Sequence, residues 1–339
     1  MRMKLGILLA TLAACGDSSK STAVDAASIA NLPDAGEDPD DPRRIGAGGG
    51  KGGTIVVPKD GGILGDGGQL PGGGSGGNGG LPPQPEGTCA NPFILPSNVA
   101  HSDLLVNTST KQHTLDLPCG GTGKEVVIAF EITQRELVYA DTFGANWNTV
   151  LSFADKCNAT PAPSAGESTM SCSNDACGSP QSQAIAVLGY GRHYLIVSGA
   201  NGESGPVTVH FQHALLGNGP IAALPAGAGM IQGTSSGTGI VSRCEATAAE
   251  NSYWWSTCPA YAGGAFTATT CNTGTTFDTI LNVQIPKTET TSCGDDDPNC
   301  GVLSTLGATI PAGAGIHVMT LDGDTVNSVG AYTVKYTRP

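Results

Sequence analysis

An acidic run enclosed by two cysteines is the segment of this sequence best suited to hold a metal ion. Asp295, Asp296 and Asp297 lie between Cys293 and Cys300. Calcium takes about six to eight oxygen ligands, and an acidic loop closed by a disulfide supplies roughly two or three of them. These aspartates are therefore a candidate Ca2+ site, and if the site binds calcium, we predict that millimolar calcium raises the melting temperature by several degrees. A turn rich in Asp and Asn that binds no ion is the alternative.

Two adjacent tryptophans form a second candidate binding site. Tyr253, Trp254 and Trp255 are consecutive, and successive side chains of a strand point to opposite faces, so one of the two indole rings faces the core. The other could stack on a sugar or a protein partner. A covered sheet edge or a contact between domains is the alternative.

The residues that could act in catalysis do not converge. Residues 233–237 (GTSSG) fit the Gly-x-Ser-x-Gly pattern of hydrolase nucleophiles, but that pattern needs a helix after it, and the surrounding glycine, serine and threonine predict a flexible turn. His210 and His213, three apart on a predicted strand, point to opposite faces and cannot jointly bind one ion from that strand. Without a set of acid, base and nucleophile, we predict that the chain is not an enzyme.

Ten cysteines follow Cys15, five in residues 89–213 and five in residues 214–339. An exported chain keeps such cysteines oxidised, and their spacing is a poor match to a zinc site. The disulfide candidates are Cys89, Cys119, Cys157, Cys172, Cys177, Cys244, Cys258, Cys271, Cys293 and Cys300. Proximity along the chain favours the pairs Cys293–Cys300, Cys258–Cys271, Cys157–Cys172 and Cys89–Cys119, although other pairings remain open. Either Cys177 and Cys244 join the two halves, or each half keeps one free thiol.

The two halves repeat one pattern. Residues 147–153 (WNTVLSF) return as residues 277–283 (FDTILNV), and the cysteine-flanked acidic segments at 172–177 and 293–300 follow in the same order. Each half alternates short apolar runs with Gly, Pro, Asn and Asp, which is typical of strands joined by turns. We predict an all-β protein of two tandem antiparallel β-sandwiches at residues 89–213 and 214–339.

Several blocks of this repeat resemble a known family. Motifs similar to those of bacterial pre-peptidase C-terminal domains occur at residues 119–123 (CGGTG), 172–175 (CSND), 205–209 (GPVTV) and 277–281 (FDTIL). The resemblance spans most of residues 89–339. It implies that each copy is a jelly-roll-like sandwich that accompanies a secreted enzyme or surface protein without being catalytic. The second copy departs from the motif at Glu245 and Ala246, where the first copy has two glycines.

The N-terminus resembles the signal peptide of bacterial lipoproteins. The apolar run over residues 5–12 follows a positively charged start and is far shorter than the ~20 residues that cross a bilayer. Two alanines precede Cys15, as in the lipobox, where diacylglycerol is attached to the cysteine. The resemblance implies a signal peptide and lipidation site at residues 1–15 and the lipid bilayer as a partner; an ordinary secretory signal is the alternative. Gly16 favours sorting to the outer membrane.

Composition supports a tethered β protein and excludes nucleic acid as a partner. Gly supplies 50 of 339 residues, and residues 16–88 cannot bury enough apolar surface to offset the entropy of ordering, so we predict a flexible tether there. The formal net charge is −13, and no segment concentrates the Lys and Arg that nucleic acid requires. We predict a non-catalytic, lipid-anchored envelope protein whose duplicated domains bind a glycan or protein partner. A structural spacer or subunit of an envelope assembly is the alternative.

Overall fold

Runs of β-branched and apolar residues form strands throughout the part of the chain that the structure, a computed structural model, describes: residues 86–96, 99–157, 171–235, 239, 244 and 246–339. The predicted lipidation site at Cys15, its signal peptide and the predicted tether up to residue 85 lie outside these residues. Gly87 already belongs to the fold, because its carbonyl accepts a hydrogen bond of 2.9 Å from the Val127 N–H. Within the described residues, no helix has the length and apolar character needed to cross a membrane.

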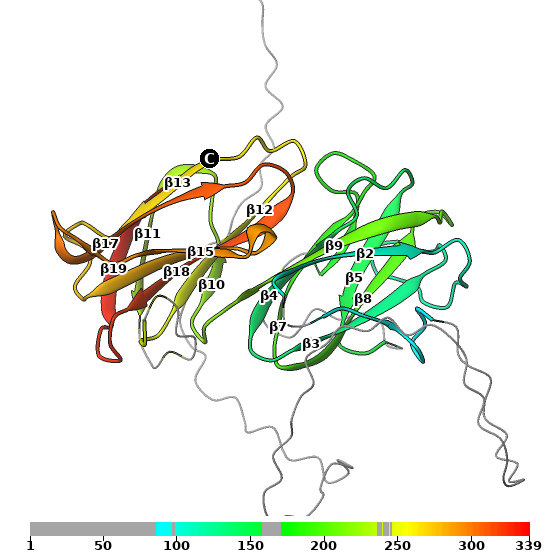
Figure 1. Cartoon of the computed structure of the whole chain (residues 1–339), viewed down its shortest axis with the longest axis horizontal. Coiled ribbons are helices and arrows are strands. Elements are labelled where there is room, and N and C mark those ends of the chain that lie inside the picture. Colours follow the sequence, from blue (N-terminus) through cyan, green and yellow to red (C-terminus); the bar gives the residue numbers. More distant parts are fainter. Residues whose placement is uncertain (1–85, 97–98, 158–170, 236–238, 240–243, 245) are drawn as a thin grey trace, which may run out of the picture. The chain divides into compact units, whose positions relative to one another are not determined.

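The first set of strands, coloured cyan to green in Figure 1, forms two sheets. One sheet contains, in spatial order, β1 (Phe93–Ile94), β3 (Val126–Ile132), β8 (Gly191–Gly199), β5 (Thr149–Ala154) and β6 (Cys172–Asn174). The other contains β2 (His101–Asn107), β9 (Pro206–Leu215), β4 (Glu136–Asp141) and β7 (Gln183–Leu188). Only the edge pair β1 and β3 is parallel in this set.

The second set of strands also forms two sheets. One contains β10 (Ile221–Ala223), β12 (Asn251–Thr257), β18 (Gly315–Gly323), β14 (Thr279–Ile285) and β15 (Thr290–Gly294). The other contains β11 (Gly227–Ser235), β19 (Gly330–Arg338), β13 (Gly264–Thr269), β17 (Gly301–Ile310) and β16 (Asp296–Asp297). A single 3-10 turn, η1 (Pro286–Thr288), separates β14 from β15 in the described chain.

The two sets have the same connectivity. Strands β10 to β15 occupy the places of β1 to β6, and β17 to β19 occupy those of β7 to β9, whereas β16 has no counterpart. From β2 to β5 successive strands alternate between the two sheets, as they do in a jelly roll. The predicted all-β fold of two antiparallel sandwiches is confirmed.

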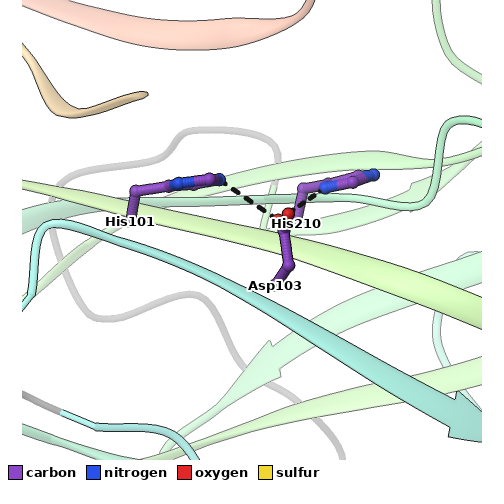
Figure 2. Close-up of side chains that lie close together, drawn as sticks. All are labelled: His101, Asp103 and His210. Carbon is purple, nitrogen blue, oxygen red and sulfur yellow. Dashed lines mark hydrogen bonds and ion pairs between the residues drawn. The ribbon is translucent and has the colours of Figure 1, made fainter. Parts of the chain in front are cut away.

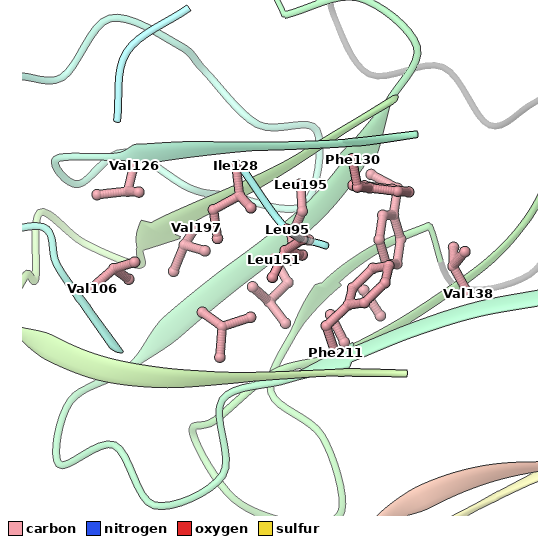
Figure 3. Close-up of a cluster of buried hydrophobic side chains, with 14 of the residues drawn as sticks. Leu95, Val106, Val126, Ile128, Phe130, Val138, Leu151, Leu195, Val197 and Phe211 are labelled. Atoms are coloured by element: carbon pink, nitrogen blue, oxygen red, sulfur yellow. The ribbon is translucent and has the colours of Figure 1, made fainter. Parts of the chain in front are cut away.

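Each sandwich encloses its own apolar core. In the first, Val126, Ile128 and Phe130 of β3 face Phe211 of β9 across the space between the sheets (Figure 3). This is the alternation expected where one face of each sheet is buried. The equivalent aromatic residues of the repeat are core in both copies: Trp147 is 7% exposed and Phe277 is 9% exposed.

A buried hydroxyl network is also duplicated. In the first sandwich the Ser182 N–H donates to the Oγ1 atoms of Thr142 and Thr149, at 3.0 Å each. In the second, the Ser304 N–H donates to the Oγ1 atoms of Thr270 and Thr279, at 2.8 and 3.2 Å. In each copy, the two threonine hydroxyls thus supply acceptors to a buried backbone donor.

The two sandwiches contact each other through one face of β4, β7 and β9 and through β18. An apolar cluster joins them, made of Leu137, Tyr139, Ile185, Val187, Ala214, Leu216, Ile316 and Val318. Glutamine amides bond the backbone across the junction: Gln183 Nε2 donates to the Thr257 carbonyl at 3.1 Å, and Gln212 Oε1 accepts from the Ile316 N–H at 3.1 Å. The described residues all belong to one compact unit.

All ten cysteines after Cys15 are bonded, but the pairs differ from those that proximity favoured. The disulfides are Cys89–Cys157, Cys119–Cys172, Cys177–Cys258, Cys244–Cys293 and Cys271–Cys300. The predicted pairs Cys293–Cys300, Cys258–Cys271, Cys157–Cys172 and Cys89–Cys119 are therefore wrong. Many successive strands, such as β12 and β13, lie in opposite sheets about 10 Å apart, so cysteines close in sequence can be separated by the core. Strands β5 and β6 are paired in one sheet, but Cys172 lies opposite Ser152 rather than Cys157. Cys177 does join the two sandwiches, with Cys258 in place of the predicted Cys244.

Candidate functional site

Two histidines and an aspartate meet on one face of the first sandwich. His101 and Asp103 are two residues apart on β2, so their side chains share a face. The antiparallel register places Asp103 opposite His210 of β9. The pairing of two strands that are far apart in the sequence therefore assembles a group of three metal-ligating side chains.

The three side chains are close enough to share one ligand. Asp103 Oδ1 lies 3.1 Å from His101 Nε2 and 2.7 Å from His210 Nδ1, and Figure 2 shows its carboxylate between the two imidazole rings. Partial burial acts to raise the pKa of Asp103, but the hydrogen bonds and charges of His210 and His101 outweigh it, so the pKa lies below its usual value. The rings are about one third exposed, at 28% and 32%.

A second carboxylate lies beside this group. Asp141 of β4 is opposite His210 in the strand register and is 2% exposed. Its oxygens accept from the Tyr139 hydroxyl at 2.7 Å and from the Phe143 N–H at 3.0 Å. Burial raises the pKa of Asp141, and the charges of His210 and Lys287 oppose this rise.

The group lines a cavity at the junction of the sandwiches. The cavity has a volume of about 300 Å³ and is lined by residues of both copies, including Asp141, Pro259 and Lys287. Lys287 Nζ donates to the carbonyls of Ala312 and Ala314, at 3.1 and 3.3 Å. The arrangement thus offers two imidazoles and a carboxylate to an ion, with open space beside them.

Sequence reasoning missed this site because it left β2 out of the predicted strands. With a strand at residues 101–107, the His-x-Asp spacing alone would have indicated one shared face. The prediction that His210 and His213 point apart is confirmed, since His210 contacts Asp103 whereas His213 Nδ1 lies 2.7 Å from Glu136 Oε2. The histidine that shares a group of ligands with His210 is His101, on a distant strand, rather than His213.

The predicted calcium ligands are separated into two groups. Asp295 and Asp296 lie with Asp278, which the sequence did not single out, and their ligand atoms are within 4.8 Å of one another. Burial, then the charges of Asp324, Asp296 and Asp295, raises the pKa of Asp278. Asp297 instead accepts from the Asn299 N–H at 2.8 Å. The Ca2+ site at these residues stays a prediction.

The two tryptophans divide as alternation predicted. Trp255 is 2% exposed and stacks on Phe266 with ring centroids 5.0 Å apart. Trp254 is half-buried and packs against the apolar cluster at the junction of the sandwiches. The alternative interpretation, a contact between domains, therefore describes Trp254.

The first three residues of the serine motif lie on a strand rather than in the predicted turn. Residues 233–235 are the end of β11, paired with β19, while residues 236 and 237 lie outside the described part. Ser235 is 1% exposed, and its Oγ donates to the Ala249 carbonyl at 2.7 Å. Pairing with β19, which local composition does not encode, explains why the turn prediction was wrong for residues 233–235.

Comparisons with known proteins give no family assignment. No protein-family model matches the chain, and no curated protein matches it. Among solved structures, the pre-peptidase C-terminal domain of a Bacillus anthracis collagenase aligns at 9% identity and a TM-score of 0.24, covering 40% of this chain and 99% of that one. The CUB1-EGF-CUB2 domains of rat MASP-1 align at 8% identity and a TM-score of 0.21, covering 73% and 100%. A Paenibacillus xanthan lyase aligns at 12% identity and a TM-score of 0.21, covering 70% and 25%. These TM-scores are too low to establish a shared fold.

Proposed function

We propose that the chain is a non-catalytic, lipid-anchored protein of the bacterial cell envelope, held at the outer membrane through Cys15, whose paired β-sandwiches bind a protein or glycan partner. The lipobox-like segment supports the anchor. Five disulfides among the described residues agree with an oxidising compartment. The motifs similar to pre-peptidase C-terminal domains support an accessory role.

The observation that carries the proposal is the bonded junction between the sandwiches. The Cys177–Cys258 disulfide, the shared apolar cluster and the glutamine amides join the two copies at several points. A surface composed of two copies joined in this way is ordered before a partner arrives. Binding then avoids part of the entropy cost of ordering flexible domains.

A structural spacer is the second candidate function. The position of Trp254 favours it, because a ring packed at the junction is not free to stack on a sugar.

If the chain instead recognises a partner, another aromatic ring must provide the stacking surface. Tyr190, which lies between β7 and β8 and is 83% exposed, offers such a ring.

Pull-downs from envelope extracts and a glycan array separate these functions. The acylated protein, Tyr190→Ala and Trp254→Ala are compared. A defined ligand retained by the wild type and lost in Tyr190→Ala supports recognition, while retention of no ligand by any of them favours the spacer. Turnover of ester, peptide or glycoside substrates contradicts a non-catalytic role. Mass spectrometry that finds Cys15 unmodified in the envelope fraction contradicts the anchor.

A further inference from the structure

The side chains of His101, Asp103 and His210 form a preassembled group on rigid elements. Two neighbouring strands hold them, and the pairing of β2 with β9 extends without a break from His101 to Asn107. Because all three come from strands, their positions are fixed by the backbone ladder rather than by a loop.

We propose that these three residues bind one divalent transition-metal ion of the zinc type at the junction of the two sandwiches. A tetrahedral zinc ion with ligands about 2.0 to 2.1 Å away holds neighbouring ligand atoms roughly 3.3 Å apart. The aspartate oxygen lies 3.1 and 2.7 Å from the two ring nitrogens, and all three ligand atoms are within 4.8 Å of one another. The two oxygen–nitrogen distances differ from that spacing by no more than about 0.6 Å. Binding of one ion also requires the two ring nitrogens, which lie within 4.8 Å of each other, to take up the same spacing.

The ligand types select the metal. Imidazole nitrogen suits zinc, copper, nickel and iron, whereas calcium and magnesium prefer ligand sets made of oxygen. Three protein ligands leave a fourth position open, which water fills in zinc sites of this kind. The cavity of about 300 Å³ beside the group has room for that water or for a small anionic ligand.

The surrounding charges balance the ion. Asp103 is a direct ligand, and Asp141, opposite His210 in the register, adds a second carboxyl group close by. Lys287 is the opposing charge, but two backbone carbonyls hold its ammonium. The carboxyl groups of Asp103 and Asp141, both in the first sandwich, thus offset the positive charge of a divalent ion.

The test is a zinc titration of the full processed chain after treatment with a chelator. We expect about one zinc ion per chain by calorimetry and elemental analysis, and binding at least roughly 100-fold weaker in His210→Ala. His113→Ala is the matched control, because His113 Nε2 lies 3.2 Å from Asp116 Oδ1 but belongs to no group of metal ligands found among the described residues. This variant keeps the affinity of the wild type.

A second variant and a spectroscopic signature keep the test decisive if His210→Ala unfolds. Asp103→Asn preserves the size of the side chain and removes the charge, so it weakens zinc binding and removes the visible absorption that tetrahedral Co2+ gives in the wild type. The proposal is overturned if the wild type binds no zinc at micromolar concentrations. It is also overturned if folded His210→Ala and Asp103→Asn bind zinc as tightly as the wild type, which would place the ion elsewhere, for example at Asp278, Asp295 and Asp296.

Discussion

The side-chain amide of Gln284 in the second sandwich forms two hydrogen bonds with the backbone of Leu215 in the first. Its Oε1 accepts from the Leu215 N–H at 3.1 Å, and its Nε2 donates to the Leu215 carbonyl at 2.9 Å. The amide thereby replaces the strand that would otherwise pair with this residue at the end of β9. Such a pair of bonds fixes both the position and the orientation of one copy against the other.

Gln284→Ala leaves both backbone groups of Leu215 without these partners. We expect the free energy of unfolding to fall by about 2 kcal/mol, since an unpaired buried polar group costs roughly 1 to 3 kcal/mol. Urea unfolding measures the loss. Gln232→Ala, on the exposed side of β11, is the control and changes stability by less than about 0.5 kcal/mol. Equal effects of the two substitutions would show that the amide does not stabilise the junction.

The duplicated hydroxyl network predicts similar losses in the two copies. Thr149→Val and Thr279→Val keep the side-chain shape but each removes an acceptor from a buried N–H. Each variant is expected to lose about 1 kcal/mol or more, whereas Thr267→Val, exposed on β13, is close to neutral. Thermal unfolding measures all three. If only one of the two variants lost stability, the hydroxyl network of the other copy would not contribute to stability.

The disulfide between the copies closes a long loop. Cys177 and Cys258 are 81 residues apart in sequence, and replacing both by Ser is expected to cost about 2 to 4 kcal/mol. The copies should stay in contact, because the apolar cluster and the glutamine bonds remain, so the radius of gyration from X-ray scattering is unchanged. Non-reducing peptide mapping that links Cys177 to a different cysteine would contradict this pairing.

His213 stabilises the fold more in acid than in base. Burial acts to lower the pKa of His213, but Glu136, the Val99 carbonyl and Glu289 outweigh it and raise the pKa above its usual value. Its contribution is complete below the unfolded pKa of about 6.5 and is lost as the pH rises through the folded pKa. We expect His213→Gln to lower the free energy of unfolding more at about pH 5.5 than at about pH 9. A pH-independent cost would contradict the raised pKa.

His317 has the opposite effect. Burial, with the charges of Arg338 and Lys287, lowers the pKa of His317 to about 3, and within the described chain neither ring nitrogen has a hydrogen-bond partner. Below about pH 6.5 this histidine is protonated in the unfolded chain but stays neutral in the folded chain. The free energy of unfolding therefore decreases as the pH is lowered. His317→Phe should remove this part of the acid sensitivity, as measured by urea unfolding between about pH 7 and pH 4.5. The same pH slope in variant and wild type would disprove it.

Local sequence patterns were enough to predict many of the strands and their duplication. Strands β3 (Val126–Ile132) and β5 (Thr149–Ala154) coincide with two of the short apolar runs that indicated strands. Nearly all of their residues are buried, so the apolar character of each run is visible without information from distant residues. The likeness of residues 147–153 to residues 277–283 likewise indicated the repeat that the shared connectivity displays. Alternation also divided the side chains of Trp254 and Trp255 between opposite faces.

The residues that meet from distant parts of the sequence could be identified only from the folded chain. The disulfides, the junction and the group formed by His101, Asp103 and His210 depend on strand register and on which sheet receives each strand. In a jelly roll, many strands that follow one another in the sequence lie in opposite sheets. Closeness in the sequence therefore predicted the wrong disulfide for Cys258 and Cys271. The contacts proposed for function therefore depend on which strands pair, and local sequence patterns do not predict those partners.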